Sequence, residues 1–222
     1  RRFTIRADEA IIALLAIRLV NELHNTAPNV EVDFLPESKN TVDELRSGQL
    51  DLAIGVYTFQ DPDLEASTLL TDRFVAAVRL KHPLTDKKLT PARYAAAQHL
   101  SVSPRAQRTG PIDVALAKKN LQRTRIMTVP TFVTAGHLVA TTDLVGNLPR
   151  GLVSSLSSYL PITSLEIPLS LPEFTVKQHW HRRNNNDSGH DFFRRTIDRT
   201  AQFLRPDDSN QPAPTSPQTP SA

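Results

Sequence analysis

Residues 42–56, VDELRSGQLDLAIGV, decide the fold, because they join a short charged helix, a glycine and a buried strand. Gly48 is expected to end the helix, since a residue without a Cβ takes the left-handed conformation easily. Residues 52–54 form an apolar run that is typical of a sheet covered on both faces. Gly55 then ends the strand, where glycine weakens pairing unless a ligand or another backbone approaches closely. The stretch therefore predicts a strand that points at a ligand.

The residues before this stretch predict a parallel α/β sheet. Residues 3–6 alternate between apolar and polar, a strongly apolar helix is expected over 9–25, and residues 30–34 alternate again. Strand, helix, strand, helix, strand is the order of a parallel sheet. In such sheets, ligands bind beyond the carboxyl ends of the strands, which is where Gly55 lies.

A second α/β series follows in the sequence. Two strands are expected at 64–70 and 73–80, and Thr90 with Pro91 then has the pattern of a helix start. From there we expect helices at 91–97, 112–120, 132–141 and 188–203, and strands at 99–103, 125–129, 143–147, 164–168 and 174–182. We therefore predict two lobes: lobe I from residues 1–80 with 177–205, and lobe II from residues 81–176. Residues 206–222 have the composition of a disordered tail.

Composition and charge exclude several classes of protein. The 222 residues carry 26 Lys and Arg against 23 Asp and Glu, a surplus too small for a nucleic-acid-binding surface. The absence of cysteine excludes disulfides, zinc thiolate sites and thiol nucleophiles. The first residues lack a secretion signal, and the longest apolar run, residues 10–17, is far shorter than the roughly 20 residues of a membrane span. We expect a soluble, cytoplasmic protein.

Catalytic motifs are missing from this α/β chain. Gly146 and Gly151 have the outer spacing of a phosphate loop, but no Gly-Lys-Ser/Thr follows. No GxGxxG or GxSxG motif occurs either. The expectation is a protein that is not an enzyme and has no cofactor.

Histidines offer one alternative, a metal site. His179 and His181 flank Trp180 on an expected strand, so both imidazoles could bind a metal together with His190 or Asp191. Metal sites usually show denser clusters of ligands. The favoured interpretation is a pair of surface histidines around a packing tryptophan, with no metal bound.

Three strand-to-helix corners are candidate ligand contacts. Asp8 with Glu9 can cap the first helix, bind a polar group of a ligand, or do both. The loop 103–110, SPRAQRTG, supplies hydroxyls and two arginines, or is simply a solvated basic loop. At Thr131 and Phe132, the ring can stack on a ligand or fill the core.

The first helix has more apolar residues than one sheet can cover. In IIALLAIRLVNEL, residues 11–23, the apolar side chains surround much of the helix. The surplus predicts a second partner for this helix, either the other lobe or another subunit.

An ordered set of segments resembles the effector-binding region of LysR-type transcriptional regulators. These segments are LRSGQLDLAIGV, LLTDRFVAAVRLKHPL, YAAAQHLSVS, GPIDVALAKKNLQR, VPTF and TDLVGNLPRG, and the likeness extends over residues 1–205. The branch that it resembles most includes regulators that respond to aromatic compounds. The resemblance implies a type 2 periplasmic-binding-protein-like fold, in which each lobe is a mixed, mostly parallel sheet flanked by helices and an inducer binds between the lobes.

Residues of the inducer site are also implied by the resemblance. By position they are Ala7, Asp8, Val56, Ser103, Arg105, Thr131 and Phe132. The aromatic-responsive branch often has a histidine where this chain has Thr131, so the inducer can differ. We expect a small organic effector, aromatic and acidic.

The resemblance also implies partners. The winged helix-turn-helix of the family does not precede the first strand, so we expect a fragment that senses the effector, with DNA bound only through the missing N-terminal domain. The family's sensor domains pair antiparallel, which predicts a homodimer or tetramer with the first helix against residues 133–141 of a partner, where Ala135, Gly136 and Ala140 allow close approach. The rival interpretations are a solute-binding protein for transport, which a signal peptide would favour, and an enzyme on the same fold.

Overall fold

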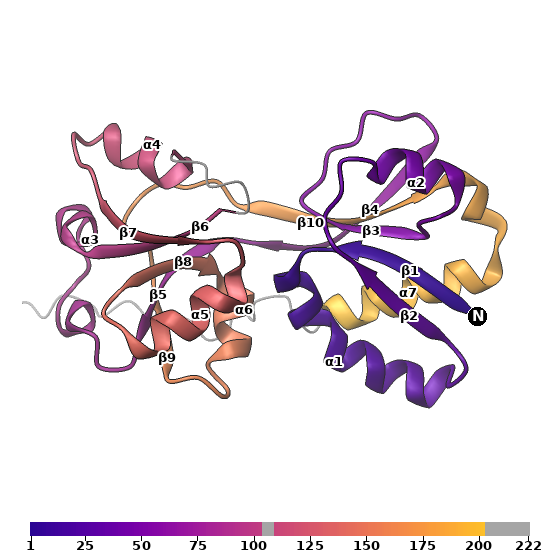
Figure 1. Cartoon of the computed structure of the whole chain (residues 1–222), viewed down its shortest axis with the longest axis horizontal. Helices are drawn as coiled ribbons and strands as arrows, with labels where there is room; N and C mark the ends of the chain where they lie inside the picture. The colour runs from indigo at the N-terminus through magenta and orange to yellow at the C-terminus, as the bar shows by residue number, and fades with distance from the viewer. Residues whose placement is uncertain (104–108, 203–222) are drawn as a thin grey trace, which may run out of the picture.

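The structure, a computed structural model, describes residues 1–103 and 109–202, which form two lobes (Figure 1). Each lobe is built on one five-stranded sheet. The first sheet has the order β2-β1-β3-β10-β4, with β1 Arg2–Ala7, β2 Glu31–Leu35, β3 Leu52–Gly55, β4 Leu64–Asp72 and β10 Phe174–His181. The second has the order β7-β6-β8-β5-β9, with β5 Phe74–Arg79, β6 Gln98–Val102, β7 Thr124–Val129, β8 Val145–Pro149 and β9 Ile162–Leu165.

The two sheets share one topology. In the first, β1 is parallel to β2 and β3, and β10 is antiparallel to both β3 and β4. In the second, β6 is parallel to β7 and β8, and β5 is antiparallel to both β8 and β9. One strand in each sheet therefore runs against the other four. The predicted α/β fold with two mixed, mostly parallel sheets is confirmed.

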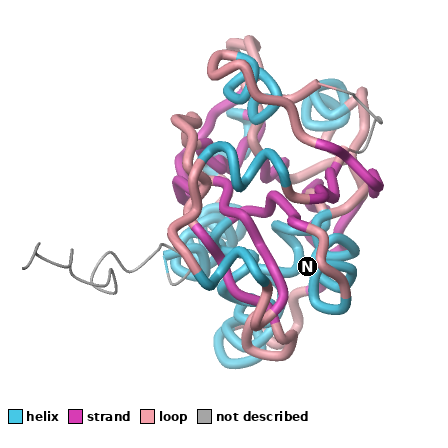
Figure 2. Tube along the Cα trace, turned by 90° about the vertical axis from the view of Figure 1, so that its left-hand side faces the viewer, coloured by secondary structure: helices cyan, strands magenta, loops and turns pink. Residues whose placement is uncertain are grey.

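Helices pack against the strands of both sheets, and Figure 2 shows helices around the strands in a view along the long axis of the molecule. In the first lobe they are α1 Glu9–Thr26, α2 Thr41–Ser47, α7 Ser188–Gln202 and the 3-10 turn η2 Arg182–Asn186. In the second they are α3 Pro91–Ala96, α4 Pro111–Ala117, α5 Phe132–Thr141, α6 Arg150–Leu156 and the 3-10 turn η1 Pro83–Asp86. Within the described residues, none of these helices combines the length and the apolarity that a membrane span requires.

Both expected lobe boundaries differ from the observed sheets. Residues 73–80 are expected in lobe I, but β5 pairs with β8 and β9 in the second sheet. Residues 174–176 are expected in lobe II, but they begin β10 of the first sheet. The chain leaves the first sheet at Asp72 and enters the second at Phe74. The apolar run FVAAVR is suited to either buried sheet, and only long-range pairing decides between them. The return crossing is made by β10, whose start at Phe174 lies opposite Asp72.

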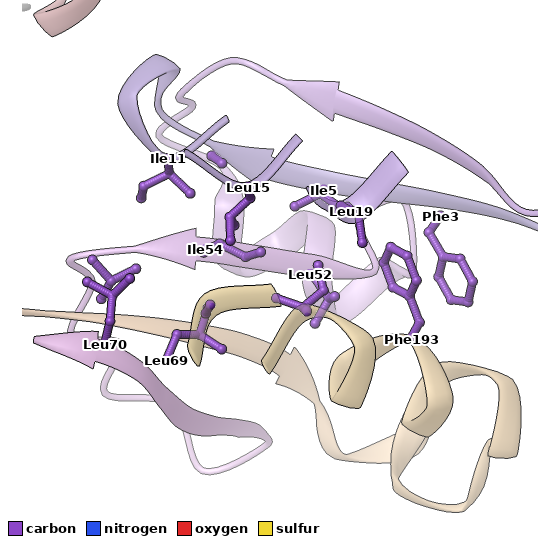
Figure 3. Close-up of a cluster of buried hydrophobic side chains, with 14 of the residues drawn as sticks. Phe3, Ile5, Ile11, Leu15, Leu19, Leu52, Ile54, Leu69, Leu70 and Phe193 are labelled. Atoms are coloured by element: carbon purple, nitrogen blue, oxygen red, sulfur yellow. The ribbon is translucent and has the colours of Figure 1, made fainter. Parts of the chain in front are cut away.

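The core of the first lobe lies between the sheet and helices α1 and α7 (Figure 3). Ile11, Leu15 and Leu19 recur every four residues, so one stripe of α1 faces the sheet. Phe193 of α7 is fully buried and stacks on Phe3 of β1, with ring centroids 4.0 Å apart. This stripe is the part of α1 that its own sheet covers.

The surplus apolar residues of α1 lie partly against the second lobe and partly in solvent. Ala10, Ala13 and Leu14 pack against the core of the second lobe, which also contains residues of α5 and α6. Ile17 and Val20 remain 72% and 64% exposed. The expected second partner of α1 is therefore, in part, the other lobe of the same chain.

The small residues of α5 lie in the interior of the fold. Ala135 and Gly136 face the interior of their own lobe, and a Cβ on Gly136 would lie 2.5 Å from Leu156 Cδ1 of α6. All three small residues, Ala135, Gly136 and Ala140, are buried within the chain, and Gly136 leaves room for Leu156 of α6. The pairing of residues 133–141 with a partner subunit stays a prediction.

Candidate ligand-binding site

A pocket of about 240 Å³ lies between the two lobes. The first lobe contributes apolar residues of α1 and β4, and the second contributes the starts of β5 and α5. Its walls are almost entirely apolar, and its only charged lining residues within the described chain are Asp8 and Asp72. A molecule in this pocket touches both lobes at once.

The predicted site residues are placed as follows. Asp8, Val56 and Phe132 line the pocket. Ala7 is buried in the core of the first lobe, directly before Asp8. Thr131 is the N-cap of α5, where its Oγ1 accepts from the Thr134 backbone N–H at 3.4 Å. The Ser103 N–H donates to the Val129 carbonyl at 2.9 Å, which holds the loop start beside β7. Arg105 lies outside the described residues.

Asp8 has the capping role that the sequence analysis expected. Its Oδ1 accepts from the Ile11 N–H at 2.9 Å and thereby caps α1. Burial raises the pKa of this carboxyl, and the negative charges of Glu37 and Glu9 raise it further. The Asp8 carboxylate therefore favours a proton or a hydrogen-bond donor of a ligand beside it, and disfavours an anionic group of a ligand.

Gly55 is explained by a packing contact rather than directly by a ligand. A Cβ at this position would lie 2.6 Å from Cε2 of Tyr57. The Tyr57 ring stacks on Phe59 with centroids 5.1 Å apart, and its hydroxyl donates to Glu37. The glycine thus lets the chain fold an aromatic ring back over the strand end, and this leaves Val56 at the pocket.

Asp72 connects the two lobes at the first crossing. Its Oδ1 accepts from the Arg73 N–H at 2.7 Å, and its Oδ2 accepts from the Gly151 N–H at 3.0 Å. The second bond satisfies a free N–H at the start of α6, so a carboxylate of β4 caps a helix of the other lobe. Burial raises the pKa of Asp72, opposed by these backbone hydrogen bonds.

Two phenylalanines of the pocket were not predicted. Phe74 and Phe174 stand at the two crossings, with ring centroids 5.0 Å apart, and Phe132 lies 6.0 Å from Phe74. A sequence pattern could have indicated them, because each follows an acidic residue closely, in DRF and PEF, at the start of an expected strand. The three rings form one aromatic wall.

The alternative of a histidine metal site finds no support in the structure. Across residues 1–103 and 109–202, no three His, Cys, Asp or Glu side chains come together in a metal-binding arrangement. His179 is buried, with Phe59 packed edge-on at 4.9 Å between ring centroids. Burial lowers its pKa, and Lys177 lowers it further. His181 Nδ1 accepts from the Arg183 N–H at 3.1 Å.

Comparisons with known proteins point to a single family. The family model described as LysR substrate binding domain matches residues 1–202. The HTH-type transcriptional activator NahR of Pseudomonas putida is 26% identical over 188 residues, which are 84% of this chain and 63% of NahR. The chain thus spans less than two thirds of the length of that relative.

Solved structures share the fold. A transcriptional regulator from Vibrio parahaemolyticus has a TM-score of 0.79 at 20% identity, over 91% of this chain and 96% of that one. The effector binding domain of QuiR in complex with shikimate has a TM-score of 0.67 at 18% identity, over 91% and 98% of the two chains.

Proposed function

The chain belongs to the LysR substrate-binding domain family, and on that premise we propose that the pocket between its lobes binds the effector of a transcriptional regulator. The effector is a small organic molecule with an aromatic or otherwise apolar body. The observation that carries the proposal is the apolar pocket of about 240 Å³, which residues of both lobes line.

The charges around the pocket refine the class of ligand. Asp8 and Asp72 are carboxylates, and no cationic side chain of the described residues lines the pocket. These two groups favour a neutral molecule or one that donates hydrogen bonds. An acidic effector would need a cation such as Arg105, which the sequence analysis assigned to the site. Thr131, Ser103 and Ala7 stay in the proposed site as residues that shape its edge.

The two crossings supply the means of switching. A ligand shifts an equilibrium between lobe arrangements only by its differential affinity for them. Here a ligand touches α1 of one lobe and Phe132 of the other, so a change in lobe angle alters its contacts. Asp72 couples the first crossing to α6 through its bond to Gly151, which transmits the change into the second lobe.

The remaining features of the regulator are part of the same proposal. DNA is bound by a separate N-terminal domain of the full-length protein, in the cytoplasm, and this chain is a binding module without catalysis. Two copies associate through the exposed face of α1 that contains Ile17 and Val20, because these neighbouring apolar residues are left uncovered by both lobes.

A thermal-shift screen of phenols, aromatic aldehydes and aromatic acids tests the site. Wild type is compared with Val56→Trp, which fills the pocket from a position 60% exposed. The control is Val114→Trp, a valine of α4 that is 50% exposed and does not line the pocket. A compound at about 100 times its Kd should raise the Tm by roughly 5 to 10 °C.

Two results bear on the proposal directly. Stabilisation of wild type and of Val114→Trp, but not of Val56→Trp, supports the pocket between the lobes. Equal stabilisation of all three proteins, or none by any compound, overturns it.

A further inference from the structure

A second cavity, of about 260 Å³, lies within the second lobe. It is bounded by β6, β8 and the start of α4, together with the segment that leads into β10. Phe74, Phe132 and Phe174 line this cavity and the pocket between the lobes, so the aromatic wall is common to both. Further apolar walls come from Val102, Ile112 and Leu171.

Three buried polar side chains line this cavity, and each has an atom without a hydrogen-bond partner. Ser101 and Asn147 are 7% and 8% exposed, and the side chain of Arg123 is 6% exposed. Within the described residues, Ser101 Oγ, Asn147 Nδ2 and Arg123 Nη1 have no partner. Buried polar atoms are nearly always paired, and leaving one unpaired is costly. Because three unpaired polar atoms line the same cavity, one bound molecule could pair with all of them.

The other bonds of these side chains show which groups are free. Arg123 Nε and Nη2 donate to the two oxygens of Asp113 at 2.8 and 3.1 Å, which leaves Nη1 as a donor. The Tyr94 hydroxyl donates to Asn147 Oδ1, which leaves the amide N–H groups. The Ser101 hydroxyl can donate or accept. The free groups are thus mostly donors, and their partner must be an acceptor.

Charge and volume limit which partner fits these groups. Asp113 neutralises Arg123, and Arg125 lies 3.9 Å from the same carboxylate. Glu173 is an exposed residue of the cavity lining. The surroundings are close to neutral, which allows a carbonyl oxygen or a single carboxylate. A cavity of about 150 Å³ already holds benzene, so about 260 Å³ accommodates one substituted ring against the aromatic wall.

We propose that this cavity is a second binding site, which takes a single-ring aromatic compound and holds its carbonyl or carboxylate oxygen on Ser101, Arg123 and Asn147. The site is separate from the pocket between the lobes and stands without the function proposed for that pocket. Phe74, Phe132 and Phe174 line both cavities, and the remaining lining residues differ between the two.

Protein-detected NMR titrations of this chain test the second site with three probes. Acetophenone presents a carbonyl, benzoate presents a carboxylate, and ethylbenzene has nearly the shape of acetophenone without the oxygen. Ser101→Ala removes a hydroxyl that has no partner in the fold, so this variant should fold as wild type does. Ile112→Trp fills the cavity instead, and Val56→Trp fills only the pocket between the lobes.

The expected result is a pattern across probes and variants. At least one of acetophenone and benzoate binds more tightly than ethylbenzene. The tighter binder of the two shows whether the site prefers a carbonyl or a carboxylate oxygen. Its affinity falls by about twofold to tenfold in Ser101→Ala, as one lost hydrogen bond requires, and by more in Ile112→Trp. Val56→Trp leaves it unchanged.

Three outcomes overturn the second site. One is that neither oxygen-bearing probe binds, and another is that ethylbenzene binds as tightly as they do. The third is that Val56→Trp abolishes binding while Ser101→Ala and Ile112→Trp do not, which would assign the probe to the pocket between the lobes. The function proposed for that pocket is tested separately by the thermal-shift screen.

Discussion

His99 should make the stability of the second lobe depend on pH. The side chain is fully buried, and its Nε2 donates to the Tyr94 carbonyl at 2.8 Å. The imidazole also packs edge-on against the Tyr94 ring, with centroids 4.8 Å apart. Burial lowers the pKa of His99 from its ordinary value of 6.5 to about 4. The folded protein therefore prefers the neutral imidazole.

The size of the effect follows from this difference in pKa. The neutral form is favoured in the folded state, so the stability that His99 contributes is fully present above pH 6.5 and is lost as pH falls towards 4. Full protonation of His99 would lower the free energy of unfolding by about 3 kcal/mol. About 2 kcal/mol of this decrease occurs between pH 7 and pH 5. His179 and His190 also have lowered pKa values, so wild type should lose more than this in total.

Urea denaturation of wild type and His99→Gln at pH 7 and pH 5 measures the contribution. Glutamine keeps a donor for the Tyr94 carbonyl but cannot be protonated. Wild type should lose about 2 kcal/mol more than the variant between the two pH values, seen as a larger fall in the urea midpoint. His137→Gln, at an exposed position of α5, should lose as much as wild type. Equal losses in wild type and His99→Gln would refute the reasoning.

Three further changes test the packing, the buried ion pair and the association. Phe193→Ala should lower the free energy of unfolding by about 3 to 5 kcal/mol in urea, whereas Phe192→Ala, at a half-buried position, should cost clearly less; similar losses would contradict the stacked core. Asp113→Ala leaves the buried Arg123 uncompensated and should lower the free energy of unfolding by about 3 kcal/mol, whereas Arg2→Ala, in an exposed pair, should change it far less; a loss as small as that of Arg2→Ala would show that Arg123 is hydrated. Sedimentation at tens of micromolar should show a dimer for wild type and for Val114→Ser but a monomer for Ile17→Ser/Val20→Ser, and a monomeric wild type would contradict the association.

The local elements could be predicted because each depends on a short pattern. The alternation in residues 3–6, the capping residue Asp8 and the helix end at Gly48 each specify one element from nearby residues, and the structure has all three. Assignment of β5 to a sheet failed, because pairing between Phe74 and Pro149 depends on residues 75 positions apart. Patterns of period two show that a strand exists but do not show its neighbour.

The candidate site was predicted only in part for the same reason. Asp8 and Phe132 stand at strand-to-helix corners, which the order of elements reveals. The aromatic wall forms where the two crossings meet. Ser101, Arg123 and Asn147 come together because β6 pairs with both β7 and β8 in the second sheet. Asn147 could have been noticed as a polar residue within an apolar strand, but the residues near it in the sequence do not indicate which side chains lie beside it in the fold.

The crossings also make the second lobe an insertion into the first. Asp72 and Phe174 lie directly opposite each other on antiparallel strands, so their Cα atoms are only about 5 Å apart. A two-residue turn such as Asn-Gly could join them and replace everything between. The molecule is thus modular: the first lobe is continuous in space although interrupted in sequence, and residues 73–173 are an insertion that is covalently joined to it at the two crossings.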